Sequence, residues 1–300
     1  MNTLITATMS TLLNNPHFRL FAGAVMISFS AVFVKLVDVP PTTSGFYRAL
    51  VGGGVLLAFI AITGRRIRFV RAAWIALLVS SVFFALDLWF WHRSILYIGP
   101  GLSTLLANFQ VFIMAAAGIV VFGQRPSARQ LLAIPLAITG LVMIVGLDWN
   151  SLASEYRLGV VLGLLTAVSY AGYLLAMRQA RAYSDTRLPL SEIAVMSLLV
   201  AGILGGVAMV ENVSLAIPTL RDASWLIVYG VIANGLGMMA IASSLSRVGT
   251  TEVGIALLLQ PTLSFAWDIL FFARPTTTIE FIGAAIALCA IYLGSRSRSK

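Results

Sequence analysis

Ten apolar segments of roughly membrane-spanning length, separated by short polar stretches, constrain this chain more than any other feature. A helix that crosses the hydrocarbon core of a bilayer needs about 20 mostly apolar residues. Hydrophobic residues make up 59% of the 300-residue chain and charged residues only 10%, a balance typical of membrane proteins and not of water-soluble domains. The expected spans are residues 18–37, 44–63, 72–92, 102–122, 130–147, 159–177, 190–210, 224–243, 252–272 and 279–294.

These segments predict an all-α polytopic membrane protein that packs as one helical unit. The loops are too short to form a separate soluble domain, and backbone polar groups in lipid must be satisfied within helices. The segments divide five plus five, which predicts a first repeat over residues 1–150 and a second over residues 151–300. Because each half holds an odd number of spans, the second repeat is expected to be inverted in the membrane, as in many secondary transporters.

The net charge of +9 is distributed as a topology signal. Fourteen of the twenty Lys and Arg residues lie in one set of alternating loops and in the C-terminal tail: Arg19, Arg65, Arg66, Arg68, Arg71, Arg125, Arg129, Arg178, Arg181, Arg187, Arg247, Arg296, Arg298 and Lys300. An excess of basic residues marks cytoplasmic loops, so both termini are predicted to be cytoplasmic. The expected neighbours of these charges are anionic lipid headgroups of the bilayer, and no nucleic-acid partner is expected.

The residues needed for a metal centre or a common catalytic site are scarce. Cys289 is the single cysteine, and His17 and His92 are the only histidines, so no disulfide, metal site or other cofactor is expected. Residues 1–16 lack the basic start and the cleavage site of a signal peptide. The sequence contains no His-Glu-x-x-His, no Gly-x-Ser-x-Gly and no carboxylates paired at helical spacing. The chain is therefore not predicted to be an enzyme.

Polar and aromatic side chains form stripes on four of the predicted helices, where polar groups are costly and so informative. If helices three, four, six and nine surround one cavity, these stripes converge on a substrate site; ordinary packing and the aromatic belts of the membrane surface are the alternatives. The stripe residues are Ser80, Asp87 and Trp91 in helix three, Asn108 and Gln110 in helix four, Tyr170 and Tyr173 in helix six, and Gln260, Ser264, Trp267 and Asp268 in helix nine.

The charged residues near these stripes have two readings each. Asp87 and Asp268 could bind a substrate ammonium group or a proton, or be structural carboxylates paired with a neighbouring helix. Arg48 could bind a substrate carboxylate or extend to the interface. His92 is expected more as an interfacial hydrogen-bonding group than as a proton relay. Pro261 lacks a backbone donor in the middle of helix nine, which makes it the expected hinge.

Several stretches resemble the EamA-type family, the ten-helix branch of the drug/metabolite transporter superfamily. They are VKLVDVPPTTSGFYRALVGG at 34–53, LAIPLAITGLVMIVG at 132–146, QPTLSFAWDILFFARP at 260–275 and FIGAAIALCAIYLG at 281–294. Within that superfamily the chain looks most similar to bacterial aromatic and neutral amino-acid exporters. The resemblance covers essentially the whole chain and implies an inner-membrane efflux carrier with a central cavity between inverted halves.

Three positions depart from the family pattern. Val111 stands where a proline is usual in the fourth helix, and Gln124 and Arg274 stand where glutamates commonly end the fourth and ninth helices. Any role of those glutamates therefore does not carry over to this chain.

The function expected from the residues and the resemblance is export of amino acids or similar small metabolites by alternating access. Export of hydrophobic drugs or cations in the same fold is the alternative, and a channel-like protein is a third. The absence of a ring of charges at one depth argues against an ion-selective filter. A monomer or a weak oligomer is expected, while the substrate, the energy coupling and the direction of net flux stay open.

Overall fold

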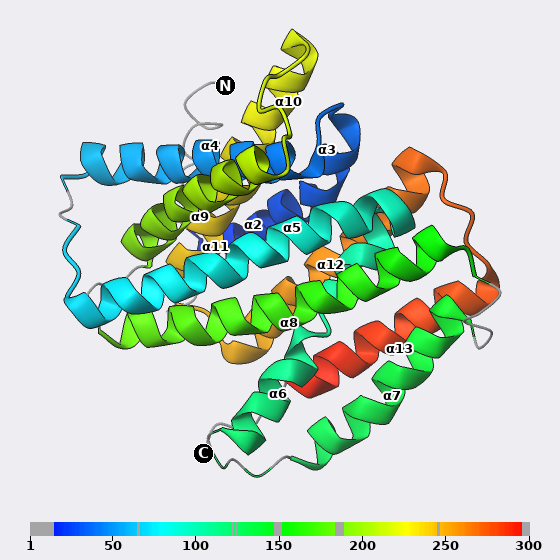
Figure 1. Ribbon diagram of the computed structural model, residues 1–300. Coiled ribbons are helices and arrows are strands. Elements are labelled where there is room, and N and C mark those ends of the chain that lie inside the picture. The colour runs from blue at the N-terminus through cyan, green and yellow to red at the C-terminus, as the bar shows by residue number, and fades with distance from the viewer. Residues whose placement is uncertain are drawn as a thin grey trace, which may run out of the picture.

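The protein is a bundle of helices (Figure 1). A computed structural model describes residues 15–64, 67–121, 123, 125, 127–146, 152–183, 189–244 and 247–295. Its helices are α2 (Pro16–Ser28), α3 (Ser30–Leu36), α4 (Pro41–Ile62), α5 (Arg71–Ala107), α6 (Gln110–Val120), α7 (Ala128–Val145), α8 (Ser154–Ala182), α9 (Leu190–Val210), α10 (Leu220–Tyr229), the π-helix η2 (Gly230–Gly237), α11 (Met238–Ser244), α12 (Thr250–Phe272) and α13 (Thr278–Ser295).

Nine helical stretches within the described residues are long and apolar enough to cross a membrane, and one of them divides into two. This stretch, Arg71–Val120, has 50 residues. A straight helix of that length would be about 75 Å long, more than twice the thickness of the hydrocarbon core. The chain turns at Gly99, whose φ of 83° and ψ of 164° are not helical and favour glycine. Pro100 then begins the next helical segment. The prediction of an all-helical polytopic membrane protein is confirmed.

Two other spans are interrupted in the middle. The first span is divided at Phe29, between α2 and α3. The eighth span passes from α10 through the π-helix η2 into α11. Long π-helices are rare, and short π-helical turns are often found at functional sites. These two interruptions therefore point to the part of the bundle where the functional side chains are to be sought.

The helix pairs are symmetric: when each of the first five spans is exchanged with the corresponding one of the last five, the same set of pairs results. The third span packs on the sixth through α5 and α8, and the eighth packs on the first through α11, η2 and α2. The second and seventh spans, α4 and α9, pack on each other, as do the fifth and tenth, α7 and α13. Figure 1 shows α7 and α13 side by side next to α6. This symmetry supports two repeats, whose predicted boundary at 150/151 lies outside the described residues.

Close backbone contact between the halves depends on small residues. A Cβ atom at Gly140 of α7 would lie 2.7 Å from the backbone nitrogen of Ala287 and 2.8 Å from the carbonyl oxygen of Gly283 in α13. A Cβ atom at Gly52 of α4 would lie 2.4 Å from Cβ of Asn234 in the π-helix. Lipid provides no hydrophobic drive for helix association, so such approaches provide the van der Waals contacts that hold the bundle together.

The Gly52→Ala substitution should destabilise the protein, because the new methyl group would overlap Asn234. Overpacking of this kind typically costs about 1–3 kcal/mol. The matched control is Gly54→Ala in the same helix, where the added Cβ meets no atom within 4 Å. We expect a lower thermal unfolding temperature in detergent for Gly52→Ala and an unchanged or higher one for Gly54→Ala. Equal melting temperatures for the two variants would contradict the close contact between α4 and η2.

Candidate functional site

Buried charged and aromatic side chains from four helices meet in one place, which we call the central cluster. Its cation, Arg48 of α4, lies over three aromatic rings, with its guanidinium carbon 5.3 Å from the ring centre of Tyr229, 5.5 Å from that of Trp91 and 5.9 Å from that of Phe84. The central cluster consists of Arg48 (α4), Phe84, Asp87, Trp91 and His92 (α5), Tyr170 and Tyr173 (α8) and Tyr229 (α10).

A chain of hydrogen bonds fixes the direction in which Arg48 donates. Its Nη1 donates to the Tyr229 hydroxyl at 3.0 Å, and that hydroxyl lies 3.4 Å from Nε2 of His92. Nδ1 of His92 lies 2.7 Å from the carbonyl oxygen of Leu88. Because a carbonyl oxygen can only accept, Nδ1 carries a proton, and in the neutral imidazole Nε2 accepts from the Tyr229 hydroxyl. The fully buried His92 is therefore a fixed internal link rather than a group at the membrane surface.

Arg48 and Asp87 are buried in the same cluster without being paired to each other. Arg48 is near enough to Asp87 for a coulombic interaction, yet the described residues contain no ion pair within 4.0 Å for either side chain. Nε of Arg48 is buried and makes no hydrogen bond in the described part of the protein. Buried charges are costly unless they are paired. The cluster thus offers a ligand one guanidinium and one carboxyl group that are not paired with each other.

Tyr170 and Tyr173 form the aromatic wall of the cluster on α8. Their ring centres are 5.2 Å apart, and the Tyr173 ring lies 4.7 Å from that of Phe84. One turn before Phe84 in α5, the Ser80 hydroxyl donates to the backbone carbonyl of Tyr173 at 3.4 Å. The predicted residues on helices three and six are therefore brought together with Arg48 and His92.

The predicted residues on helix nine lie elsewhere and contact the first span. The Ser264 hydroxyl donates to the carbonyl oxygen of Ser28 at 2.9 Å, and Nε1 of Trp267 donates to the Ser28 hydroxyl at 2.9 Å. The Trp267 ring also stacks on Phe29 with ring centres 4.7 Å apart. These contacts provide hydrogen-bond donors for the carbonyl and the hydroxyl of Ser28, where the first span is interrupted.

Asp268 lies beside the turn between the third and fourth spans. Its Oδ2 accepts a hydrogen bond from the backbone nitrogen of Gly101 at 3.0 Å. A Cβ atom at Gly99 would lie 2.6 Å from the same oxygen, so the turn leaves no space for a side chain. For this oxygen, the geometry agrees with the structural reading of Asp268, in which a neighbouring helix supplies the partner, whereas Oδ1 has no partner among the described residues.

The remaining predicted residues are distributed along the bundle. The Asn108 amide donates to the carbonyl of Thr104 in its own helix at 2.8 Å. Gln260 is half-buried, and α12 continues through Pro261 as one helix, so the hinge at Pro261 stays a prediction. Gln124, one of the departures from the family pattern, lies outside the described residues.

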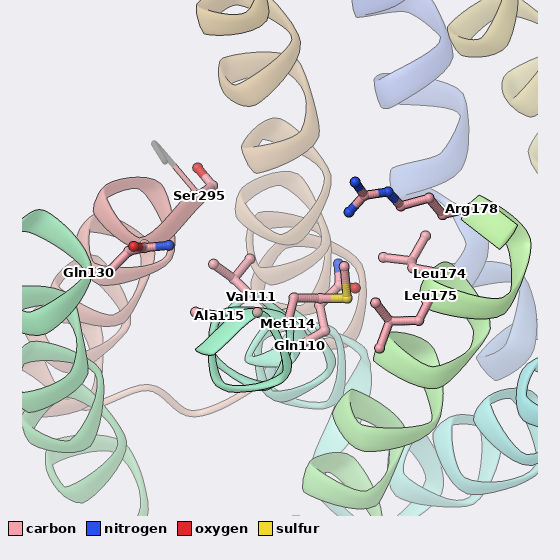
Figure 2. Close-up of a pocket in the computed structure, with 11 residues that line it drawn as sticks. Gln110, Val111, Met114, Ala115, Gln130, Leu174, Leu175, Arg178 and Ser295 are labelled. Atoms are coloured by element: carbon pink, nitrogen blue, oxygen red, sulfur yellow. The ribbon is translucent and has the colours of Figure 1, made fainter. Parts of the chain in front are cut away.

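Gln110 lines a groove near the end of the bundle that the charge pattern predicts to be cytoplasmic. The groove has a volume of about 250 Å³ and runs between α6, α8 and α13. Figure 2 shows Gln110 and Met114 of α6 facing Leu174, Leu175 and Arg178 of α8. Oε1 of Gln110 is buried and has no hydrogen-bond partner among the described residues. The groove therefore presents the amide oxygen of Gln110, which has no hydrogen-bond partner among the described residues, and the basic side chain of Arg178 further along.

At the opposite end of the bundle, Glu211 ties the end of α9 to α4 and α5. It accepts hydrogen bonds from Thr42 at 2.6 Å, from Nε1 of Trp89 at 2.7 Å and from Arg93 at 2.8 Å. Burial acts to raise the pKa of Glu211, but the hydrogen bonds from Thr42 and Trp89 and the Arg93 charge outweigh it and hold the pKa below its usual value. We call these four residues the Glu211 junction.

Several of these residues are not predicted from the sequence pattern, namely Tyr229, Ser28 and Glu211. Tyr229 lies directly before a run with three glycines at 230, 235 and 237, which was the available signal for an irregular helix. Glu211 directly follows α9, the seventh span, and has no sequence pattern that links it to Arg93.

The chain matches the EamA-like transporter family over residues 16–146 and 157–296. The chain belongs to this family. It is therefore a membrane transporter and not an enzyme.

Individual proteins of known or assigned role are also similar. The pseudopaline exporter of Pseudomonas aeruginosa is 25% identical over 282 residues, which cover 92% of this chain and 95% of that protein. A probable amino-acid metabolite efflux pump of Escherichia coli K12 is 26% identical over 205 residues, covering 64% of this chain and 66% of that protein. A solved crystal structure matches with a TM-score of 0.66 at 16% identity, over 94% of this chain and 98% of the other, which shows the fold.

Replacing Glu211 with Gln should destabilise the protein at neutral pH, because the variant loses the charge that accepts from three side chains. A carboxylate with a lowered folded pKa stabilises fully above its unfolded pKa, about 4.3, and loses that contribution as the pH falls through the folded value. The difference in melting temperature between wild type and Glu211→Gln should therefore shrink on acidification. The control is Glu155→Gln, at an exposed position in the first turn of α8. A difference that does not depend on pH would contradict the ionised junction.

The Tyr229→Phe substitution should impair transport while leaving the fold intact, since it removes only the hydroxyl between Arg48 and His92. Loss of one hydrogen bond to a charged group is worth about 1.5–3 kcal/mol, so the apparent affinity for substrate should change about tenfold or more. Uptake into proteoliposomes is the measurement, with Tyr183→Phe at an exposed tyrosine as the control. Unaltered kinetics in Tyr229→Phe would remove this hydroxyl from the mechanism.

Proposed function

We propose that this transporter exports amino acids, including aromatic and neutral ones, or similar small zwitterionic metabolites, across the bacterial inner membrane by alternating access. Both termini would lie in the cytoplasm, as the distribution of Lys and Arg predicts. The printed roles of the two relatives, a pseudopaline exporter and a probable amino-acid metabolite efflux pump, support export of small metabolites. The residues of the central cluster support the choice of a zwitterion.

The observation that carries this proposal is the presence of a guanidinium and a carboxyl group, those of Arg48 and Asp87, in one buried cluster without an ion pair between them among the described residues. Arg48 would bind the substrate carboxylate through its free guanidinium N–H groups, since Nη1 is directed by Tyr229 and Nε has no partner among the described residues. Asp87 would bind the substrate ammonium group. A zwitterion supplies both missing counter-charges at once, and so offsets the cost of burying Arg48 and Asp87.

The aromatic residues of the cluster would contact the substrate side chain. Trp91, Tyr170 and Tyr173 supply flat apolar surfaces, while the tyrosine hydroxyls keep polar groups available at the edges. Such a wall suits aromatic and neutral side chains better than strongly charged ones, because no further unpaired charge of the cluster faces them.

The groove along α6 is the proposed route from the cytoplasm. It lies at the predicted cytoplasmic end and is lined by Arg178 and by the unpartnered amide oxygen of Gln110. Its volume of about 250 Å³ is slightly below the range typical of small-molecule sites, about 300–1,000 Å³. The substrate would pass from this groove along α8 toward Tyr173 and Tyr170.

Counterflow in liposomes tests the substrate class. Purified protein should exchange radiolabelled aromatic and neutral amino acids, and Arg48→Gln should lower the exchange rate at least about tenfold, because the carboxylate loses its charged donor. Arg129→Gln, at an exposed arginine of α7, is the matched control and should retain the wild-type rate. A panel of amino acids without any exchange would remove the substrate claim.

The Asp87→Asn variant separates zwitterions from hydrophobic cations, the alternative substrates of this fold. An amino acid held mainly by its carboxylate should retain much of its rate in this variant, whereas transport of a lipophilic cation should collapse because its only counter-charge is gone. Asp38→Asn, at an exposed aspartate, is the control. Transport of cations by wild type together with no transport of amino acids would replace the proposed substrate class.

A further inference from the structure

A second polar cavity lies at the opposite end of the bundle, away from the central cluster. Its volume is about 420 Å³, within the range of about 300–1,000 Å³ typical of small-molecule sites. Residues from the first, third, sixth, ninth and tenth spans line it, together with the stretch that connects α12 to α13. The polar lining residues are Lys35, Tyr97, Tyr156, Asp268, Arg274 and Glu280. None of them belongs to the central cluster.

Two oppositely charged side chains in this lining each have one satisfied and one unsatisfied atom. Oδ2 of Asp268 accepts from the backbone of Gly101, whereas Oδ1 is buried and has no hydrogen-bond partner among the described residues. Nη2 of Arg274 contacts Glu280 at 3.3 Å, whereas Nη1 is likewise buried and unpartnered in the described structure. Unsatisfied buried atoms of this kind are rare and call for an explanation. A ligand that both donates and accepts would satisfy the two atoms together.

The charges of the lining sum to zero, which selects for a ligand of no net charge. Lys35 and Arg274 are balanced by Asp268 and Glu280, so a bound cation or anion would leave an excess of one sign. Asp268 and Arg274 do not form an ion pair within 4.0 Å in the described structure, and Arg274 pairs with Glu280 instead. The Lys35 ammonium lies 4.9 Å from the ring centre of Phe272 and is exposed, so it remains available at the mouth of the cavity.

We propose that this outer cavity is a second binding site for a small zwitterion such as an α-amino acid. The ligand carboxylate binds Arg274 and Lys35, and its ammonium group binds Oδ1 of Asp268. Tyr97 and Tyr156 contact its side chain. The inference rests on the substrate class proposed for the central cluster, and it adds a second site, at which the transporter binds substrate on the outer side.

Equilibrium binding of radiolabelled L-tyrosine to the full-length protein tests this site. The protein is placed in nanodiscs of phosphatidylglycerol, so that no ethanolamine headgroup is present. Wild type should show two classes of site. Arg274→Gln should remove one class or weaken it at least about tenfold, and Arg48→Gln should remove the other. Lys35→Gln, at an exposed position, should weaken the outer class without affecting the fold. Arg221→Gln, at an exposed arginine outside the cavity lining, is the control.

The outcomes separate the two proposals. Loss of all tyrosine binding in Arg48→Gln, or two unchanged classes in both Arg274→Gln and Lys35→Gln, would overturn the outer site. If Arg48→Gln changes nothing while Arg274→Gln removes a saturable class, the outer site stands and the central assignment fails. Circular dichroism and gel filtration identify any variant that does not fold.

A lipid headgroup with both a phosphate and an ammonium group has the same chemistry as an amino acid. Repeating the measurement in nanodiscs that contain phosphatidylethanolamine distinguishes the two sources. Tyrosine binding to the outer class that persists with phosphatidylethanolamine supports the solute site. Tyrosine binding to that class only in the absence of phosphatidylethanolamine would assign the cavity to the lipid and overturn the solute proposal.

Discussion

Polar groups inside a bilayer find partners only within the protein, and this constraint organises the structure wherever a helix is broken. The turn at Gly99 leaves the backbone nitrogen of Gly101 free, and Asp268 of the other half accepts from it. The interruption after Ser28 exposes a carbonyl, to which Ser264 donates. In both cases the satisfying side chain comes from the opposite half of the chain. The breaks in one repeat are therefore part of what holds the other repeat in place.

Several buried side-chain atoms in the described part of the protein have no hydrogen-bond partner. Four of them belong to the central cluster, the α6 groove and the outer cavity, and others, such as Ser30 Oγ and Ser44 Oγ, belong to none of the three. The central cluster holds Arg48 and Asp87 apart, the α6 groove leaves Gln110 without a partner, and the outer cavity leaves atoms of Asp268 and Arg274 unsatisfied. A protein that only had to be stable would be expected to pair these groups. A transporter must instead keep binding capacity in reserve and release it again, which agrees with the unsatisfied groups of the central cluster, the α6 groove and the outer cavity.

The hydrophobic pattern predicts the spans well because it measures the property that the membrane selects. The expected segments at 44–63, 190–210 and 252–272 agree within a few residues with α4, α9 and α12. The end of the third span was placed too early, at residue 92, because Arg93 and Ser94 lower the local hydrophobicity. In the structure these residues are inside the helix, where Arg93 binds Glu211. The Ser94 hydroxyl donates to the carbonyl of Gly159 and is hydrogen-bonded to the Ser103 hydroxyl.

The sequence predicts which polar residues share a helix face, but not which faces meet. The stripe of Ser80, Asp87 and Trp91 is on one buried face of α5, as expected from helical spacing. The stripe of Ser264, Trp267 and Asp268 has the same spacing, yet its partners are a backbone carbonyl, a serine hydroxyl and a backbone nitrogen. Backbone partners appear only when helices break, and breaks such as Phe29 carry no proline or glycine to mark them. Tyr229 was missed for a related reason, since its role depends on the π-helix that follows it.

That π-helix has a mechanical consequence. A π-helical turn holds about one residue more than an α-helical turn, so conversion of one into the other rotates the two flanking segments by about 100° relative to each other. Tyr229 lies just before η2 and Asn234 within it, against Gly52. Returning η2 to an α-helix would rotate α11 relative to α10. With α11 held in place, Tyr229 at the end of α10 would rotate away from Arg48. A change of helix type in η2 would therefore rotate α11 relative to α10, directly beside Tyr229 of the central cluster.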